Sequence, residues 1–118
     1  MKPISKKTAK HYQWGDSDNP QCDGWHLVES ETLSVIQERM PPNTQEVMHF
    51  HQKAEQFFFV IEGNATMIVD GEVHQLTSQQ GIHIPAGTPH QMKNLTDCDL
   101  HFTVTSTPPS HGDRVVVE

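Results

Sequence analysis

Apolar and polar residues alternate in short runs along most of the chain, beginning at Trp25. This period of two is typical of strands that bury one of their two faces. Turn-forming residues separate the runs, among them Pro41-Pro42-Asn43 and Asp70-Gly71, and the latter pair is a strong signal for a tight hairpin. The pattern predicts roughly eight to ten short strands, with turns about every 8 to 12 residues and no convincing helix. We therefore expect an all-β sandwich or barrel.

The first part of the chain differs from the rest. Residues 1–24 are polar and broken by turn formers. We interpret them as an N-terminal arm that precedes a single domain over residues 25–118, because a chain of 118 residues is long enough for only one core. Trp14 and Trp25 are expected to anchor this arm on the body of the domain.

Strand alternation also predicts which side chains share a face. In the first strongly alternating segment, Leu33, Val35 and Gln37 fall on one face. In two later segments the same parity groups apolar residues that are expected to line a small apolar pocket, although a plain core role explains them equally well. These expected lining residues are Phe58, Val60, Phe102 and Val104.

Composition and charge exclude several functions. The formal net charge of −7 argues against nucleic-acid binding, which usually requires a basic patch. No apolar run approaches the length needed to span a membrane, and no signal peptide is evident. The two cysteines, Cys22 and Cys98, form no dense disulfide framework, which fits a reducing compartment. We expect a cytoplasmic protein without nucleic-acid or membrane partners.

The stretch VMHFHQKAEQFFFVIEG, residues 47–63, carries the chemistry. His49 and His51 are two residues apart, so on a strand both imidazoles point the same way. Imidazole is a good ligand for zinc, copper, iron and nickel. An HxH pair also arises by chance in a chain with nine histidines, so this pair alone does not establish a metal site.

A second stretch, GIHIPAGTPHQMKN, residues 81–94, adds a third histidine, His90, after a proline–glycine turn. Together the two stretches resemble the two motifs of the cupin superfamily. His49, His51 and Gly63 fall on the first motif, and the second motif is matched at four positions. These four are Pro85, Gly87, His90 and Asn94.

The resemblance implies a double-stranded β-helix, or jelly-roll barrel, with a metal held by three histidines. Both motifs normally open with a glycine, and here Asn43 and Gln79 stand at those positions. Asparagine tolerates a left-handed backbone, so Asn43 is a mild departure. Gln79 is a stronger one, for which Gly81 is expected to compensate. Asn94 is expected to hold a turn and not to bind metal.

Cupin metal sites typically add a glutamate, and two residues compete for that place. Glu55 has the right chemistry, but Gln56 has the right separation from Gly63. A shift of one position on a strand sends a side chain to the opposite face. Because the count from Gly63 runs along a strand, we favour Gln56 as the fourth ligand, with Glu55 as the alternative.

Three histidines and one glutamine form a neutral donor set for a divalent transition metal such as Fe, Mn, Ni, Cu or Zn. The ion would keep its full charge, which favours an anionic substrate or deprotonation of a bound water. One or two coordination positions would stay open. His83 is a further candidate for the pocket lining, and no catalytic residue is identified.

The resemblance leaves the reaction open, because one fold hosts many chemistries. A metal-dependent dioxygenase acting on a small organic substrate is our first hypothesis. A metal-dependent isomerase, lyase or decarboxylase is the second, and a non-catalytic module that binds a small ligand or a metal is the third. Small cupins commonly pair, so the resemblance also implies a homodimer.

Overall fold

The computed structural model describes residues 1–16 and 18–118, and its regular structure is strand throughout. This confirms the all-β prediction. Within the described residues no helix is long and apolar enough to cross a membrane. The strands are β1 (Lys10–Trp14), β2 (Cys22–Glu29), β3 (Ser34–Met40), β4 (Thr44–Gln45), β5 (His49–His51), β6 (Glu55–Glu62), β7 (Ala65–Val69), β8 (Glu72–Leu76), β9 (Gly81–Ile84), β10 (His90–Asn94), β11 (Leu100–Thr107) and β12 (Arg114–Val116).

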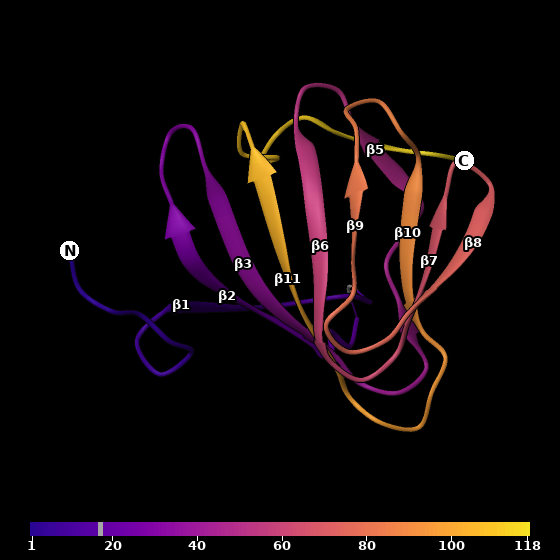
Figure 1. Cartoon of the computed structure of the whole chain (residues 1–118), viewed down its shortest axis with the longest axis horizontal. Helices are drawn as coiled ribbons and strands as arrows, with labels where there is room; N and C mark the ends of the chain where they lie inside the picture. Colours follow the sequence, from indigo (N-terminus) through magenta and orange to yellow (C-terminus); the bar gives the residue numbers. More distant parts are fainter. Residues whose placement is uncertain (17) are drawn as a thin grey trace.

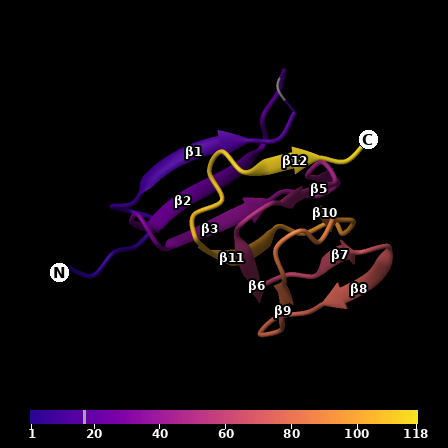
Figure 2. The same cartoon turned by 90° about the horizontal axis from the view of Figure 1, so that it is seen from above.

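The strands form two antiparallel sheets. One has the order β1-β2-β3-β11-β6-β9, and the other has the order β12-β5-β10-β7-β8, with β4 also paired to β10. Figures 1 and 2 show the first sheet on the side of the N-terminus and the second curling round to face it. The non-consecutive neighbours, such as β11 between β3 and β6, are the crossovers of a jelly-roll barrel.

The core lies between the two sheets and is built from the inward face of each strand. On β6 and β11 the alternation predicted from the sequence is observed: Phe58, Val60, Phe102 and Val104 are each at most 5% exposed. Met67 and Met92, from β7 and β10, close this core from the second sheet. The four apolar residues expected in a pocket lining are therefore part of the general core.

On strand β3 the alternating set Leu33, Val35 and Gln37 does not supply the inward face. The inward residues include Ile36, Glu38 and Met40, because these stand opposite the inward residues of β11. Leu33 lies before the strand and is exposed. Glu38, a polar residue at an inward position, weakens the apolar alternation of this strand.

Strand β1 extends the first sheet into the region expected to be an arm. It pairs with β2 along its whole length, from Lys10 opposite His26 to Trp14 opposite Cys22. The strand pattern thus begins before Trp25, where alternation first becomes visible. Trp14 packs against the core and its indole N–H donates to the carbonyl of Asp23 at 3.2 Å, so this tryptophan is an anchor as expected.

The two positions where glycine is replaced both adopt left-handed backbone, with φ of 60° at Asn43 and 70° at Gln79. The motif geometry is therefore kept without glycine. Gly81 does not supply the freedom that Gln79 was expected to need, because it is absent from the positive-φ residues. Its lack of a side chain serves packing, since a Cβ there would lie 2.5 Å from the ring of Phe57.

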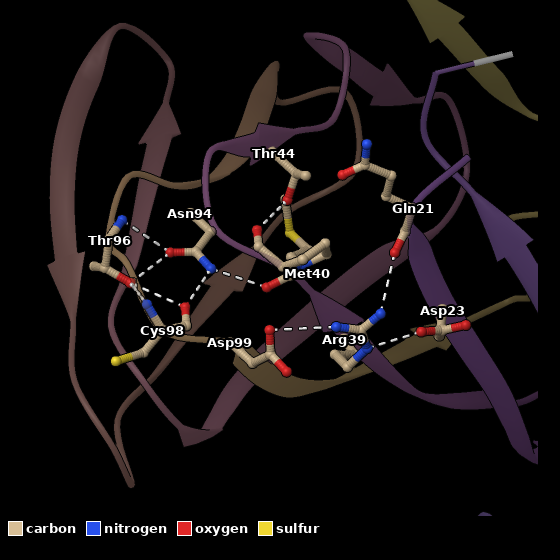
Figure 3. A network of polar contacts seen from close by, with 10 residues as sticks. Gln21, Asp23, Arg39, Met40, Thr44, Asn94, Thr96, Cys98 and Asp99 are labelled. Carbon is tan, nitrogen blue, oxygen red and sulfur yellow. Dashed lines mark hydrogen bonds and ion pairs between the residues drawn. The ribbon is translucent and has the colours of Figure 1, made fainter. Parts of the chain in front are cut away.

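Asn94 is fully buried and fixes the loop between β10 and β11, as predicted (Figure 3). Its amide nitrogen donates to the carbonyl oxygens of Met40 at 2.9 Å and Cys98 at 2.8 Å. Its amide oxygen accepts from the backbone and hydroxyl of Thr96. All of its polar capacity is spent on backbone and loop, which leaves none for a metal.

Arg39 ties the same loop to the N-terminal strands (Figure 3). Its guanidinium donates to Asp23 at 2.8 Å and lies 3.2 Å from Asp99. Burial alone would raise the pKa of Asp23, but the hydrogen bonds from His11 and Arg39 hold it below its usual value. This network links the β10–β11 loop to β2 and β3.

Candidate metal centre

Strands β5 and β10 bring three histidines together inside the barrel. His90 stands directly opposite His49 in the antiparallel pairing, and His51 follows two residues along β5 on the same face. The ring centroids of His49 and His90 are 4.5 Å apart, and the potential ligand nitrogens of all three lie within 4.8 Å of one another. The three side chains are between 1% and 6% exposed.

Each ring has its Nδ1 engaged by an oxygen that can only accept. His49 Nδ1 lies 2.7 Å from the carbonyl of Val47, and His90 Nδ1 lies 2.9 Å from the carbonyl of Thr88. Nδ1 therefore carries the proton, and Nε2 presents its lone pair. Among the described residues, the buried Nε2 of His90 has no hydrogen-bond partner. An orphaned acceptor at this place fits a metal ligand.

The electrostatics favour the neutral, ligating form of His49 and His90. Burial lowers the pKa of His49 to about 4, an effect only partly offset by its bond to the Val47 carbonyl. Burial likewise lowers the pKa of His90. At neutral pH both rings are therefore free of a second proton that a metal would have to displace.

Asp113 orients the third ring. Its Oδ1 lies 2.7 Å from His51 Nδ1, and its Oδ2 accepts the backbone N–H groups of Lys53 at 3.0 Å and Ala54 at 2.9 Å. Burial alone would raise the pKa of Asp113, but these donors outweigh it and hold the pKa below its usual value. A carboxylate behind a ligating histidine fixes its tautomer and raises its basicity. Sequence reasoning missed Asp113.

Gln56 points into the barrel, as the count along the strand predicts, and is 6% exposed. Its amide nitrogen donates to Ser106 Oγ at 3.0 Å. Its Oε1 is buried and lacks a hydrogen-bond partner among the described residues. A carbonyl oxygen left free in this way has the chemistry of a fourth ligand.

Glu55 and His83 lie on the outer surface. Both side chains are 57% exposed, and Glu55 Oε1 is 2.8 Å from His83 Nε2. Glu55 thus points away from Gln56, as expected. The expectation that His83 lines the pocket is corrected: on β9 the inward positions belong to Ile82 and Ile84, and the residue between them must face outward.

A cavity of about 930 Å³ opens beside His49. Its walls come from the β1–β2 hairpin, β3, the segment 43–47 and β12. The side chains that matter for its chemistry are Tyr12, Trp14, Glu38, Glu46 and Arg114.

Two carboxyl groups of this cavity have strongly shifted acidity. Burial raises the pKa of Glu38 to about 8, and the nearby charge of Glu46 adds to the shift. Burial also raises the pKa of Glu46 to about 7, against the opposing effects of a hydrogen bond from the Met92 backbone and of Arg114. Sequence reasoning did not identify either residue, because Glu38 lies in a strand that contains other polar residues and Glu46 lies between two short strands.

Comparison with known proteins agrees with the geometry. A family model described as "Cupin domain" matches residues 36–106, which include all three histidines and Gln56. The chain is 29% identical over 86 residues to the uncharacterised protein MJ1618 of Methanocaldococcus jannaschii, covering 72% of this chain and 69% of that protein. It is 32% identical over 69 residues to quercetin 2,3-dioxygenase of Bacillus subtilis, covering 58% of this chain and 19% of the enzyme.

Among solved structures, the polyketide cyclase RemF of Streptomyces resistomycificus superposes with a TM-score of 0.81, covering 100% of this chain and 86% of that one. The sequence identity is 19%, so this likeness concerns the fold alone. Because the family model spans more than half of the residues, the chain belongs to the cupin family.

Proposed function

We propose that this protein holds one divalent transition metal ion through His49, His51 and His90, with Gln56 as the fourth ligand. The observation that carries this proposal is the set of free, buried acceptors: the Nδ1 atoms are engaged elsewhere, and both His90 Nε2 and Gln56 Oε1 lack partners among the described residues. A metal ion satisfies such acceptors and would offset their desolvation.

The donor set suits Fe, Mn, Ni, Cu or Zn, since imidazole binds all of them. When bound, the ion supplies Lewis acidity and open coordination positions for exogenous ligands. The protein residues bury the site, and burial keeps His49 and His90 neutral. Asp113 and the two backbone carbonyls hold the rings in the ligating tautomer.

The first candidate reaction is the oxidation of a small organic substrate by dioxygen. Two observations support it: a neutral donor set with open positions, and the similarity of part of the chain to quercetin 2,3-dioxygenase. In this candidate the cavity beside His49 admits the substrate.

The second candidate is metal-dependent isomerase, lyase or decarboxylase chemistry without dioxygen. The observation that favours it is the pair Glu38 and Glu46, whose pKa values of about 8 and about 7 suit proton transfer at neutral pH.

The test begins with elemental analysis of the purified protein and anaerobic reloading with Fe(II). Oxygen uptake is then followed with catechols and diketones as probes, and products are followed by mass spectrometry. Uptake that depends on probe and metal supports the dioxygenase. Conversion without uptake supports the second candidate, whereas tight metal binding without conversion by any loaded form indicates a binding module.

A further inference from the structure

The cavity beside His49 combines aromatic walls with an excess of acidic groups. Tyr12 and Trp14 provide the aromatic surface. Glu38, Glu46 and Asp16 provide carboxyl groups, and Arg114 stands at the wall as a cation. Glu38 keeps its proton at neutral pH and Arg114 offsets one acidic charge, so the lining suits an uncharged ligand with an aromatic part.

Glu38 faces the cavity from the inward side of β3. The titratable groups around it are Tyr12 on β1, Cys22 on β2 and Glu46 across the cavity. Burial, followed by the charge of Glu46, raises the pKa of Glu38 to about 8. At neutral pH the carboxyl group keeps its proton and can donate a hydrogen bond into the cavity.

Glu46 is placed differently, although it lies in the same cavity. Its Oε1 accepts the backbone N–H of Met92 at 2.9 Å, and Arg114 on β12 favours its charged form. Two neighbouring carboxyl groups whose surroundings separate their acidities take different roles. Glu38 is the donor of the pair, and Glu46 is the group that more readily carries charge.

We propose that this cavity is the substrate chamber of the metal centre, and that Glu38 donates a hydrogen bond to a carbonyl oxygen of an uncharged aromatic substrate. The proposal rests on the proposed function for the place of the reaction, since His49 belongs to both the cavity and the ligand set. The aromatic part of the substrate packs on Trp14 and Tyr12, and its carbonyl reaches Glu38.

Acetophenone is a suitable probe because it has one aromatic ring, one carbonyl acceptor and no group that ionises between pH 6 and pH 9.5. Binding to the zinc-loaded protein is followed by NMR, through the indole N–H signal of Trp14. We expect the affinity to fall about tenfold as the pH rises through 8, because the donor is lost when Glu38 ionises.

The variant Glu38→Gln should bind acetophenone with the same affinity at pH 6 and at pH 9.5, since an amide does not lose its proton in this range. The matched control is Glu72→Gln, an exposed glutamate on β8 that should keep the fall seen in the unaltered protein. An unaltered protein without pH dependence, a Glu38→Gln variant that retains it, or no shift at Trp14 would each overturn the proposal.

A measurement on the unaltered protein covers the case in which Glu38→Gln fails to fold. Acetophenone should raise the titration midpoint of the Glu38 carboxyl carbon, because it binds the protonated form. An unchanged midpoint contradicts the proposal.

Zinc affinity, measured separately, should be equal in the unaltered protein and Glu38→Gln. Failure to bind zinc would refute the metal centre, whereas pH-independent acetophenone binding in a protein that holds zinc would refute only the role of Glu38.

Discussion

Asp113 Oδ1 lies 2.7 Å from His51 Nδ1, although 62 positions separate the two residues in the sequence. The loop that precedes β12 thereby reaches back to a ring that the β5 strand alone would leave free to rotate. The same carboxylate holds the chain just after β5 through Lys53 and Ala54. The C-terminal segment is thus part of the support of the metal centre.

Replacing this carboxylate should weaken the metal site without removing a ligand. In Asp113→Asn one of the two carboxylate oxygens becomes an NH₂ group, which cannot accept a hydrogen bond. Either the contact with His51 or the contacts with the backbone N–H groups of Lys53 and Ala54 are therefore lost. We expect metal affinity to fall by about 10- to 100-fold. Competition with a chromophoric chelator measures it, and Asp97→Asn, an exposed change in the β10–β11 loop, is the control. An affinity equal to that of the unaltered protein would contradict the positioning role.

The choice between Gln56 and Glu55 can be tested with paired variants. Gln56→Ala removes the buried amide oxygen, and we expect at least a tenfold loss of metal affinity. Glu55→Ala removes an exposed carboxylate that contacts His83, and the affinity should stay unchanged. The opposite pattern, with metal lost only in Glu55→Ala, would show that the assignment from strand parity is wrong.

Because of the Glu38 carboxyl group, the folded protein should lose stability as the pH rises toward 8. The pKa of this group is about 8 in the folded protein against an ordinary value of 4.5, so the folded state binds its proton more tightly than the unfolded state does. This contribution is fully present below pH 4.5 and is lost as the pH rises to about 8. At pH 8.5 Glu38→Gln should therefore be more stable than the unaltered protein, by on the order of 1 kcal/mol in the free energy of unfolding after allowance for solvent screening. The variant should then unfold at a higher temperature.

Thermal unfolding of the metal-free proteins at pH 5 and pH 8.5 provides the comparison. The advantage of Glu38→Gln should shrink toward zero at pH 5, where both side chains are neutral. A variant that is equally stabilised or destabilised at both pH values would indicate that Glu38 titrates normally.

Gln79 and Gly63 both have a left-handed backbone, and exchanging side chains at these two positions should change stability in opposite directions. Gln79 is exposed with φ of 70°, so Gln79→Gly should be neutral or stabilising by up to about 1 kcal/mol. Gly63 has φ of 95°, and a Cβ there would lie 2.6 Å from the carbonyl oxygen of Asp99. Gly63→Ala should cost about 2 kcal/mol or more, as measured by denaturant unfolding. A stable Gly63→Ala protein would contradict this close approach.

Strand parity predicts part of the site from the sequence alone. His49 and His51 share a face by this parity, and the inward position of Gln56 follows from it, counted along a continuous strand. These features need no knowledge of how distant segments pack. The place of His90 beside them came from the resemblance to the two cupin motifs, and the pairing of β10 with β5 confirms it.

The missing parts of the site depend on contacts between distant segments. Asp113 reaches His51 only because β12 pairs with β5, and a short polar segment gives no sign of that pairing. The cavity depends on β1, whose polar residues conceal a strand, and on Glu38, whose inward position reverses the apparent alternation of β3. In both cases the pairing partner decides the face that a residue takes.

We propose that three histidines and one glutamine hold a metal ion, and direct titration of the metal-free protein with Zn²⁺ tests this proposal. Isothermal calorimetry at pH 7.5 should find one ion bound per chain. His90→Ala should abolish this binding, and His83→Ala, on the outer surface, should leave it intact. An unaltered protein that binds no zinc, or a His90→Ala variant that binds it as tightly as the unaltered protein, would contradict the metal centre.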